Sequence, residues 1–237
     1  MPLYFNTVTP LLKTILEDLM QAKEFESFRL IGGTALSLYY GHRMSVDIDL
    51  FSDAEYGTLD FNSIDAYLRA NYFYVDSMDI APMGMGKSYY VGRSSEESVK
   101  LDLYYTDDFI DEVQEFNGLR LASKAEIAAM KLDVVQRTGR KKDFWDIDRL
   151  KDDFTINEMF VLHEKRYPYT HDRKLLKEKF TDFTQADDDF EPLCLRGRHW
   201  ELIKLDMMEF IGPLEDYLII QLPLSGYYYN NDPIPPS

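Results

Sequence analysis

The sequence predicts an α+β protein whose strands lie in the first half of the chain and whose second half is mainly helical. Short apolar runs that end at glycine or polar turn residues fall between positions 28 and 105, a pattern typical of strands. After position 122, helix-capping pairs precede segments with helical spacing. We therefore expect a sheet-containing core over residues 1–122 and a mainly helical region over residues 123–237 that completes a cleft.

The composition narrows the class of protein. Of the 237 residues, 45% are hydrophobic and 14% aromatic, so the chain can bury a sizeable core. No apolar run approaches the roughly 18 residues that cross a bilayer, and the start of the chain lacks a secretion signal. Cys194 is the single cysteine, so disulfides are not needed for folding. We expect a cytoplasmic protein with no membrane partner.

The charge balance limits contacts with nucleic acid. With 42 acidic and 26 basic residues, the chain carries a net charge of -16, which opposes general binding because phosphate contacts need Lys and Arg. Any RNA must be held locally, and the best candidate patch is Arg137, Arg140, Lys141 and Lys142. These residues equally fit a solvated helix end, where cations meet the negative pole of the helix. The acidic run at 187–189 is expected to be a solvated loop.

The first predicted element is an amphipathic helix that Thr9 caps and Pro10 begins, because apolar residues follow at helical spacing. Residues 28–31 are expected to form a short strand, residues 32–33 a tight glycine turn, and residues 34–40 a brief helix.

The next segments are mostly strands. Residues 46–51 alternate acidic and apolar side chains, so Asp47 and Asp49 share one face of the strand. Ser63 is expected to cap a helix, and further strands are expected at 73–80, 87–92 and 99–105.

Two capping boxes mark helices in the second half. Ser123 with Glu126 begins one helix, which Gly139 is expected to end, and Thr155 with Glu158 begins another.

The paired carboxylates predict a metal site. Asp47 and Asp49 would repel each other unless a cation lies between them, and magnesium takes such oxygen ligands together with substrate phosphates. Asp102 lies in a third apolar strand, where an acidic residue is costly to bury unless it is paired or bound to metal. Together the three carboxylates would suit two magnesium ions. Taken alone, each of these acidic residues also fits a solvent-exposed position without a metal, because the chain is rich in acidic residues.

A glycine turn lies just upstream of the carboxylates, at Gly32 and Gly33 followed by Thr34. A turn without side chains that opens a helix can bring backbone N–H groups against a triphosphate. An ordinary tight turn is the other interpretation. Beside the carboxylates, the turn favours a nucleoside triphosphate as substrate.

These segments resemble the AbiEii family of nucleotidyltransferase toxins, within the polymerase-β-like superfamily. The resemblance covers roughly residues 28–150 in matching order, and beyond it only a general helical character is shared. The stretches that carry it are Gly32-Gly33-Thr34-Ala35-Leu36, Gly41 to Phe51, Lys100-Leu101-Asp102, Ala129 to Asp133, and Lys141 to Asp146.

The resemblance implies a polymerase-β-like nucleotidyltransferase core, with a mixed sheet flanked by helices, followed by helices. It implies transfer of a nucleotide from a nucleoside triphosphate, in some members onto the acceptor end of tRNA, by a toxin that an antitoxin neutralises or that acts in phage defence. By motif, Asp47, Asp49 and Asp102 would be catalytic and bind magnesium. The residues that would contact the triphosphate are Gly32, Gly33, Thr34 and Ser45.

Three further residues receive roles from the same resemblance. Lys131 would offset phosphate charge, and Asp143 would orient Lys131 or the substrate, which makes both catalytic. Lys131 equally fits a lysine that extends to solvent from an amphipathic helix. Arg43 would add a phosphate contact, although a loop arginine is as often a salt-bridge partner.

Three other functions fit parts of the sequence. An acidic protein suits adenylylation of a small cationic molecule such as an aminoglycoside. An inactive binding module would keep the fold, but the intact Asp47, Asp49 and Asp102 argue against it. A metal-dependent glycosyltransferase also uses Asp-x-Asp, yet it explains neither the glycine turn nor Asp102. The order of the motifs favours transfer to RNA.

Overall fold

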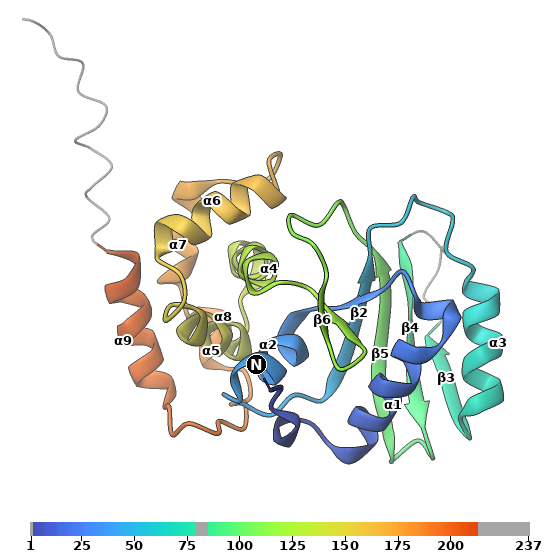
Figure 1. Ribbon diagram of the computed structural model, residues 1–237. Helices are drawn as coiled ribbons and strands as arrows, with labels where there is room; N and C mark the ends of the chain where they lie inside the picture. The colour runs from blue at the N-terminus through green and yellow to red at the C-terminus, as the bar shows by residue number, and fades with distance from the viewer. Residues whose placement is uncertain (1, 79–84, 213–237) are drawn as a thin grey trace, which may run out of the picture.

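The computed structural model describes residues 2–78 and 85–212 (Figure 1). Within these residues, seven strands form one mixed sheet in the order β3-β4-β5-β2-β1-β7-β6, which confirms the α+β prediction. The predicted strand end at Ile80 and the last part of the predicted helical region, 213–237, lie outside the described residues. The strands are β1 (Arg29–Leu30), β2 (Asp47–Ser52), β3 (Tyr74–Met78), β4 (Gly86–Gly92), β5 (Ser98–Tyr105), β6 (Gln114–Phe116) and β7 (Leu119–Leu121).

The central strands bury one face of the sheet and leave the other accessible. Along β5, buried and half-buried side chains alternate over the whole strand. Leu101 and Leu103 are fully buried, whereas Asp102 between them is half-buried. In β2, Ile48 and Leu50 are fully buried in the same way. This is the alternation that the sequence predicted, and it places the acidic residues on the accessible face.

The hairpin of β6 and β7 was not predicted. Leu121 in β7 pairs in parallel with Leu30 in β1, so the hairpin extends the sheet beyond β1. Each of its strands has three residues, which is too short for a period of two to be recognised in the sequence.

Helix α1 (Pro10–Gln21) begins where the sequence predicted, because the Leu12 backbone N–H donates to Thr9 Oγ1 at 3.1 Å. Helix α2 (Gly32–Tyr40) begins two residues earlier than predicted. Gly32 has φ +69° and opens the helix, so the glycines are its first residues rather than a separate turn.

Helix α3 (Phe61–Asn71) is capped by Asp60, and the prediction that Ser63 would cap it was wrong. Asp60 Oδ1 accepts hydrogen bonds from the backbone N–H groups of Asn62 and Ser63, each at 3.1 Å. Ser63 has the right side chain for a cap but lies inside the helix that it was expected to begin.

The second half is helical, as predicted. Ser123 and Thr155 cap α4 and α6 through the backbone N–H groups of Glu126 and Glu158, and Gly139 follows α4 directly. Two short 3₁₀ helices, η1 (Phe5–Thr7) and η2 (Lys23–Phe25), lie in the first half. The helices are α4 (Lys124–Thr138), α5 (Lys141–Leu150), α6 (Ile156–Arg166), α7 (Arg173–Phe180), α8 (Thr184–Asp187) and α9 (Trp200–Ile211).

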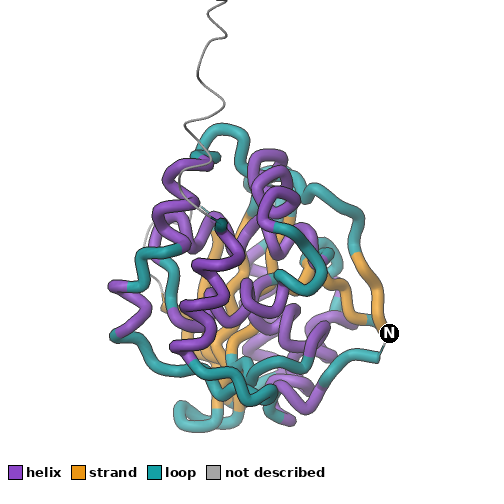
Figure 2. The backbone as a smooth tube through the Cα atoms, turned by 90° about the vertical axis from the view of Figure 1, so that its left-hand side faces the viewer, coloured by secondary structure: helices purple, strands orange, loops and turns teal. Residues whose placement is uncertain are grey.

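Helices lie on both sides of the sheet, and on the side of the carboxylates α2 packs against β2. Figure 1 shows α1 and α3 on one side and α2, α4 and α5 on the other, and Figure 2 shows the latter side from the front. Helix α2 contacts β2, α4 and α5, so the helical half is fixed to the strand that carries Asp47 and Asp49. That the two halves are separate domains stays a prediction. No helix among the described residues is long and apolar enough to cross a membrane.

Candidate active site

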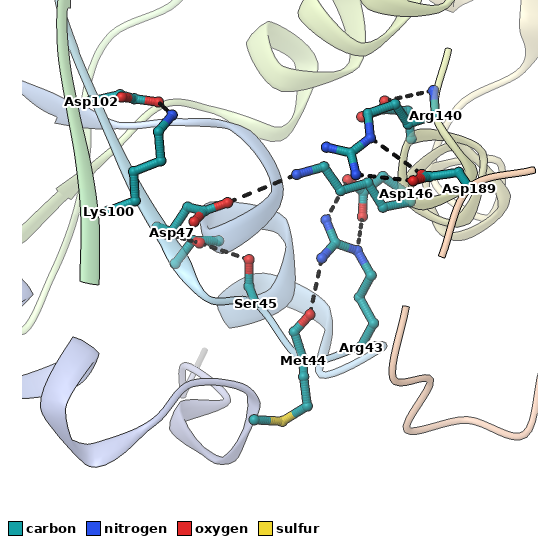
Figure 3. A network of polar contacts seen from close by, with 12 residues as sticks. Arg43, Met44, Ser45, Asp47, Lys100, Asp102, Arg140, Asp146 and Asp189 are labelled. Carbon is teal, nitrogen blue, oxygen red and sulfur yellow. Dashed lines mark hydrogen bonds and ion pairs between the residues drawn. The ribbon is translucent and has the colours of Figure 1, made fainter. Parts of the chain in front are cut away.

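The three predicted metal-binding carboxylates come from two neighbouring parallel strands. In the register of β2 and β5, Asp49 lies opposite Asp102 and Asp47 lies opposite Lys100. Residues opposite each other in neighbouring strands point to the same side of a sheet. The structure therefore brings Asp47, Asp49 and Asp102 to one face, and Figure 3 shows Asp47 and Asp102 with Lys100 beside them.

Asp49 lies at the centre of this group. Burial, and after it the negative charges of Asp102 and Asp47, raise the pKa of Asp49 to about 6. A carboxylate with a raised pKa among other carboxylates is a group that a cation would stabilise in its ionised form.

The two carboxylate oxygens of Asp102 differ, because one accepts a hydrogen bond from a lysine and the other has no hydrogen-bond partner among the described residues. Its Oδ2 accepts a hydrogen bond from Lys100 Nζ at 2.5 Å. Its Oδ1 is buried and has no hydrogen-bond partner among the described residues, which is costly unless a ligand satisfies it. As they stand, no three Asp, Glu, His or Cys side chains within 2–78 and 85–212 are arranged to enclose a metal ion. The donor atoms nevertheless fit a hard cation such as magnesium if Asp102 exchanges Lys100 for it.

Two lysines neutralise the outer carboxylates. Lys100 pairs with Asp102, and Lys142 Nζ from α5 lies 3.9 Å from Asp47 Oδ2. The side chains of Lys100 and Lys142 are 34% and 37% exposed. Ion pairs this exposed are worth little, so either lysine can exchange its carboxylate for a substrate phosphate.

The start of α2 lies directly against Asp49. The Ile31 backbone N–H donates to the Asp49 carbonyl at 2.9 Å, and a methyl group on Gly32 would lie 2.9 Å from Asp49 Oδ2. Because the N-terminus of a helix favours anions, the start of α2 is suited to an anionic ligand beside Asp49. That Gly32 contacts a triphosphate stays a prediction.

Thr34 and Ser45 are buried and bond within the protein. Thr34 Oγ1 donates to the Asp47 carbonyl at 2.5 Å, so the 2.8 Å contact between the two hydroxyls has Ser45 as donor. These bonds hold the start of β2 against α2. The predicted triphosphate contact of either side chain would require this arrangement to open.

Arg43 is a buried salt-bridge partner. Its Nε and Nη2 donate to Asp146 Oδ1 and Oδ2 at 2.7 and 2.8 Å, and its Nη1 donates to the Met44 carbonyl at 3.0 Å (Figure 3). A methyl group on Gly33 would collide with the guanidinium, so Gly33 makes room for Arg43. Of the two interpretations of Arg43, the structure favours the salt bridge over a direct phosphate contact.

Lys131 and Asp143 belong to the same buried group. Lys131 Nζ lies 2.7 Å from both Asp143 Oδ1 and Asp146 Oδ2, and its side chain is 8% exposed, so it does not extend to solvent. His42 Nε2 lies 2.8 Å from Asp146 Oδ1. We name these five residues, His42, Arg43, Lys131, Asp143 and Asp146, the Asp146 network.

The charges of the Asp146 network balance. Burial by itself would raise the pKa of Asp146, but Arg43 and Lys131 hold it well below its usual value. Burial would lower the pKa of Lys131, but its carboxylate partners outweigh this and raise it. Burial lowers the pKa of His42 despite its bond to Asp146, so His42 is neutral. Two buried cations therefore face two buried carboxylates, which is the condition for keeping ionised groups inside a protein.

The four residues of the predicted RNA patch do not form one patch, because each lies in a different environment. Lys141 is buried with its Nζ 5.5 Å from the Trp200 ring, so its assignment to a surface patch was wrong. Arg140 Nη2 donates to Asp189 Oδ1 at 3.0 Å, which also shows that the acidic run is not simply a solvated loop. Arg137 pairs with Asp133, and Lys142 faces the carboxylates.

The chain also matches a known family. Residues 14–219 match the family described as "Nucleotidyl transferase AbiEii toxin, Type IV TA system". The chain belongs to the AbiEii family. It is therefore a nucleotidyltransferase of a toxin family, and the match extends the resemblance seen over residues 28–150 into the helices that follow.

Relatives of this AbiEii protein are distant in sequence. An uncharacterized protein of Aquifex aeolicus (strain VF5) is 29% identical over 160 residues, which is 64% of this chain and 72% of that protein. A Helicobacter pylori protein has the same fold, with a TM-score of 0.55 and 19% identity over 87% of this chain and 92% of its own. MenT4, a nucleotidyltransferase toxin from Mycobacterium tuberculosis H37Rv, has a TM-score of 0.53 and 16% identity over 84% of this chain and 82% of its own.

Sequence reasoning missed the residue at the centre of the buried network. Asp146 was part of the AbiEii motif but received no role. Its spacing of three from Asp143 places both carboxylates on one helix face, which was a usable signal. The partnership of Lys100 with Asp102 was also missed, although the spacing of two along one strand places them on the same face.

Replacing Gly32 with Ala is expected to reduce both stability and activity. A left-handed backbone costs a residue with a Cβ about 1–2 kcal/mol, and the new methyl group would press on Asp49. Gly197 is a matched control, because it has φ +65° and no atom within 4 Å of an added methyl group. Urea unfolding should show a loss of stability for both variants, larger for Gly32→Ala because of the contact with Asp49, while only Gly32→Ala loses nucleotidyl transfer. Equal activities would show that Gly32 has no role at Asp49.

Proposed function

We propose that the protein uses magnesium to transfer a nucleoside monophosphate from a nucleoside triphosphate to a hydroxyl group of RNA, at the acceptor end of tRNA. The observation that carries the proposal is the register that sets Asp49 opposite Asp102, with Asp47 on the same face. Two magnesium ions held by these carboxylates would neutralise the triphosphate and activate the attacking hydroxyl.

The surrounding residues suit nucleotidyl transfer. The acceptor oxygen forms a bond to the α-phosphorus, the bond from that phosphorus to the bridging oxygen breaks, and pyrophosphate leaves while the hydroxyl proton passes to solvent or a nearby carboxylate. Such a reaction requires mainly positioning and charge stabilisation. Gly32 at the start of α2 and the exposed Lys142 would hold the triphosphate. Lys131 and Asp143, which are buried, would act by fixing α4 and α5 behind Lys142.

A second candidate acceptor is a small cationic molecule such as an aminoglycoside. The net charge of -16 favours it, because an acidic surface attracts cations and repels RNA. We also infer that an antitoxin protein neutralises the activity in the cell, in keeping with the family to which the chain belongs. Arrest of growth on expression, relieved by a neighbouring gene, would support this role.

The decisive experiment supplies each α-labelled nucleoside triphosphate with magnesium and compares total tRNA with an aminoglycoside as acceptor. We expect label in tRNA, dependent on magnesium and absent with Asp49→Asn. If only the aminoglycoside is labelled, the acceptor is a small cationic molecule and not RNA. If the triphosphate binds but neither acceptor is labelled, the chain is a binding module and the proposed function is wrong.

A further inference from the structure

The sheet face beside Asp102 is accessible over β4 and β5. Ser88 and Tyr90 in β4 lie opposite Asp102 and Lys100 in β5, so their side chains share the face of the carboxylates. All four are half-buried, whereas their neighbours on the opposite face, such as Tyr89 and Leu101, are fully buried.

Described helices pack on the other side of these strands. Helix α1 contacts β5 and α3 contacts β3, and Lys87, whose side chain points away from the carboxylates, donates to Asp65 of α3 at 3.5 Å. On the face of the carboxylates, α2 lies against β2, next to Asp49. The α2 side of the cluster thus carries the proposed triphosphate contacts, and the β4 side is left for the acceptor.

Aromatic rings border Asp102 on this accessible side. Tyr104 is two residues beyond Asp102, and Tyr90 lies opposite Lys100, two residues before it. Neither tyrosine belongs to the hydrophobic core. The Tyr104 ring lies across Gly86, where an added methyl group would come within 2.5 Å of its Cδ1, and its hydroxyl is 3.0 Å from Ser88 Oγ. Both rings are therefore half-buried surface groups that lie next to the proposed metal-binding carboxylates.

We propose that Ser88, Tyr90, Lys100 and Tyr104 form an acceptor face that binds the unpaired 3′ end of an RNA. This inference rests on the proposed function and names its acceptor surface. The terminal base stacks on Tyr104, which places its ribose over Asp102, and the preceding base stacks on Tyr90. Stacking on aromatic side chains is the usual way in which proteins hold unpaired bases.

The charges on this face suit a short single-stranded RNA end rather than an RNA duplex. Lys100 lies opposite Tyr90, and its Nζ reaches Asp102, which is two residues from Tyr104. A phosphate that joins nucleotides stacked on the two tyrosines would pass this ammonium group, and magnesium on Asp102 would release the group for that contact. Asp76 in β3 is exposed opposite Tyr90, so further phosphates would be repelled beyond that strand. With a net charge of -16, the protein would thus bind only the end of a nucleic-acid strand.

The test compares an RNA hairpin that has an unpaired 3′ end with the same hairpin made blunt. Wild-type protein is expected to label the first, and Tyr104→Ala and Tyr90→Ala are each expected to raise KM for it about 5- to 150-fold, the range for loss of one stacked base. Triphosphate affinity should stay within about twofold in both, because the tyrosines lie on the other side of the carboxylates. Tyr104→Phe, which keeps the ring, should retain wild-type KM.

A matched control and a folding check complete the test. Tyr169, which is 99% exposed on the loop after α6, supplies a Tyr→Ala change that should leave KM unaltered. The Tyr90 side chain makes no hydrogen bond or ring contact within 2–78 and 85–212, and substitution leaves the backbone pairing of β4 in place, so Tyr90→Ala tests the idea even if Tyr104→Ala fails to fold. Unchanged KM in a folded Tyr90→Ala variant, or equal labelling of the blunt hairpin, would overturn the acceptor face while RNA transfer stands. No labelling of any RNA by wild-type protein would instead overturn the proposed function itself.

Discussion

Replacing Asp146 with Asn is expected to lower the free energy of unfolding by about 3–5 kcal/mol, the usual cost of removing one partner from a buried ion pair. Asp146 is fully buried and accepts a bidentate pair from Arg43 and a contact from Lys131. Asn keeps the shape of the side chain but removes the charge, so the two buried cations would face Asp143 alone. Urea unfolding at neutral pH, followed by circular dichroism, measures the change.

Asp152 offers the control for this substitution. Its side chain is 61% exposed and pairs with Arg149 at 2.5 Å, and an exposed pair contributes at most about 1 kcal/mol. Asp152→Asn should therefore be nearly neutral. If Asp146→Asn lowers the free energy of unfolding as little as Asp152→Asn does, the ion pairs of the Asp146 network do not stabilise the fold.

The parts of the site that the sequence predicts are those with local signals. Alternation along residues 46–51 set Asp47 and Asp49 on one face, and the pairing of β2 with β5 shows the same arrangement with Asp102. Capping residues located the starts of α1, α4 and α6 to within a residue. These features depend on neighbours along the chain, so one sequence contains them.

The parts that the sequence does not predict depend on contacts between distant residues. Arg43 and Asp146 are 103 positions apart, and nothing near either residue shows that they form a bidentate pair. Lys141 and Lys142 are adjacent in the sequence, yet one packs against Trp200 and the other faces Asp47. Burial decides the role of such side chains, and burial follows from the packing of α5 against the rest of the molecule.

Replacing Asp49 with Asn is expected to reduce kcat on the order of a thousandfold, because metal activation contributes several kcal/mol to such reactions. Asp49 lies between the start of α2 and Asp102, so its loss removes the central proposed metal ligand. Initial rates of label transfer at saturating triphosphate and magnesium measure the effect. Asp107→Asn, at a residue that is 90% exposed, should leave the rate unchanged. A residual rate near that of wild type would place the metal elsewhere.

The same Asp49→Asn variant is expected to be more stable than wild type without magnesium, by about 1–2 kcal/mol at neutral pH. The raised pKa, from 3.8 to about 6, means that folding disfavours the ionised form, and partial solvent access reduces the full linkage energy. Below about pH 4 the carboxyl is protonated in both folded and unfolded chains, so the variant gains nothing there.

The gain in stability should grow from pH 4 to pH 6 and stay constant above, as wild-type Asp49 ionises in its buried position beside Asp102 and Asp47. Urea unfolding at several pH values, with and without magnesium, follows this dependence. Magnesium should remove the advantage, because a ligand that binds only the folded wild-type site stabilises it. A gain that is independent of pH would contradict the electrostatic origin. A gain that magnesium leaves intact would show that Asp49 does not bind the ion.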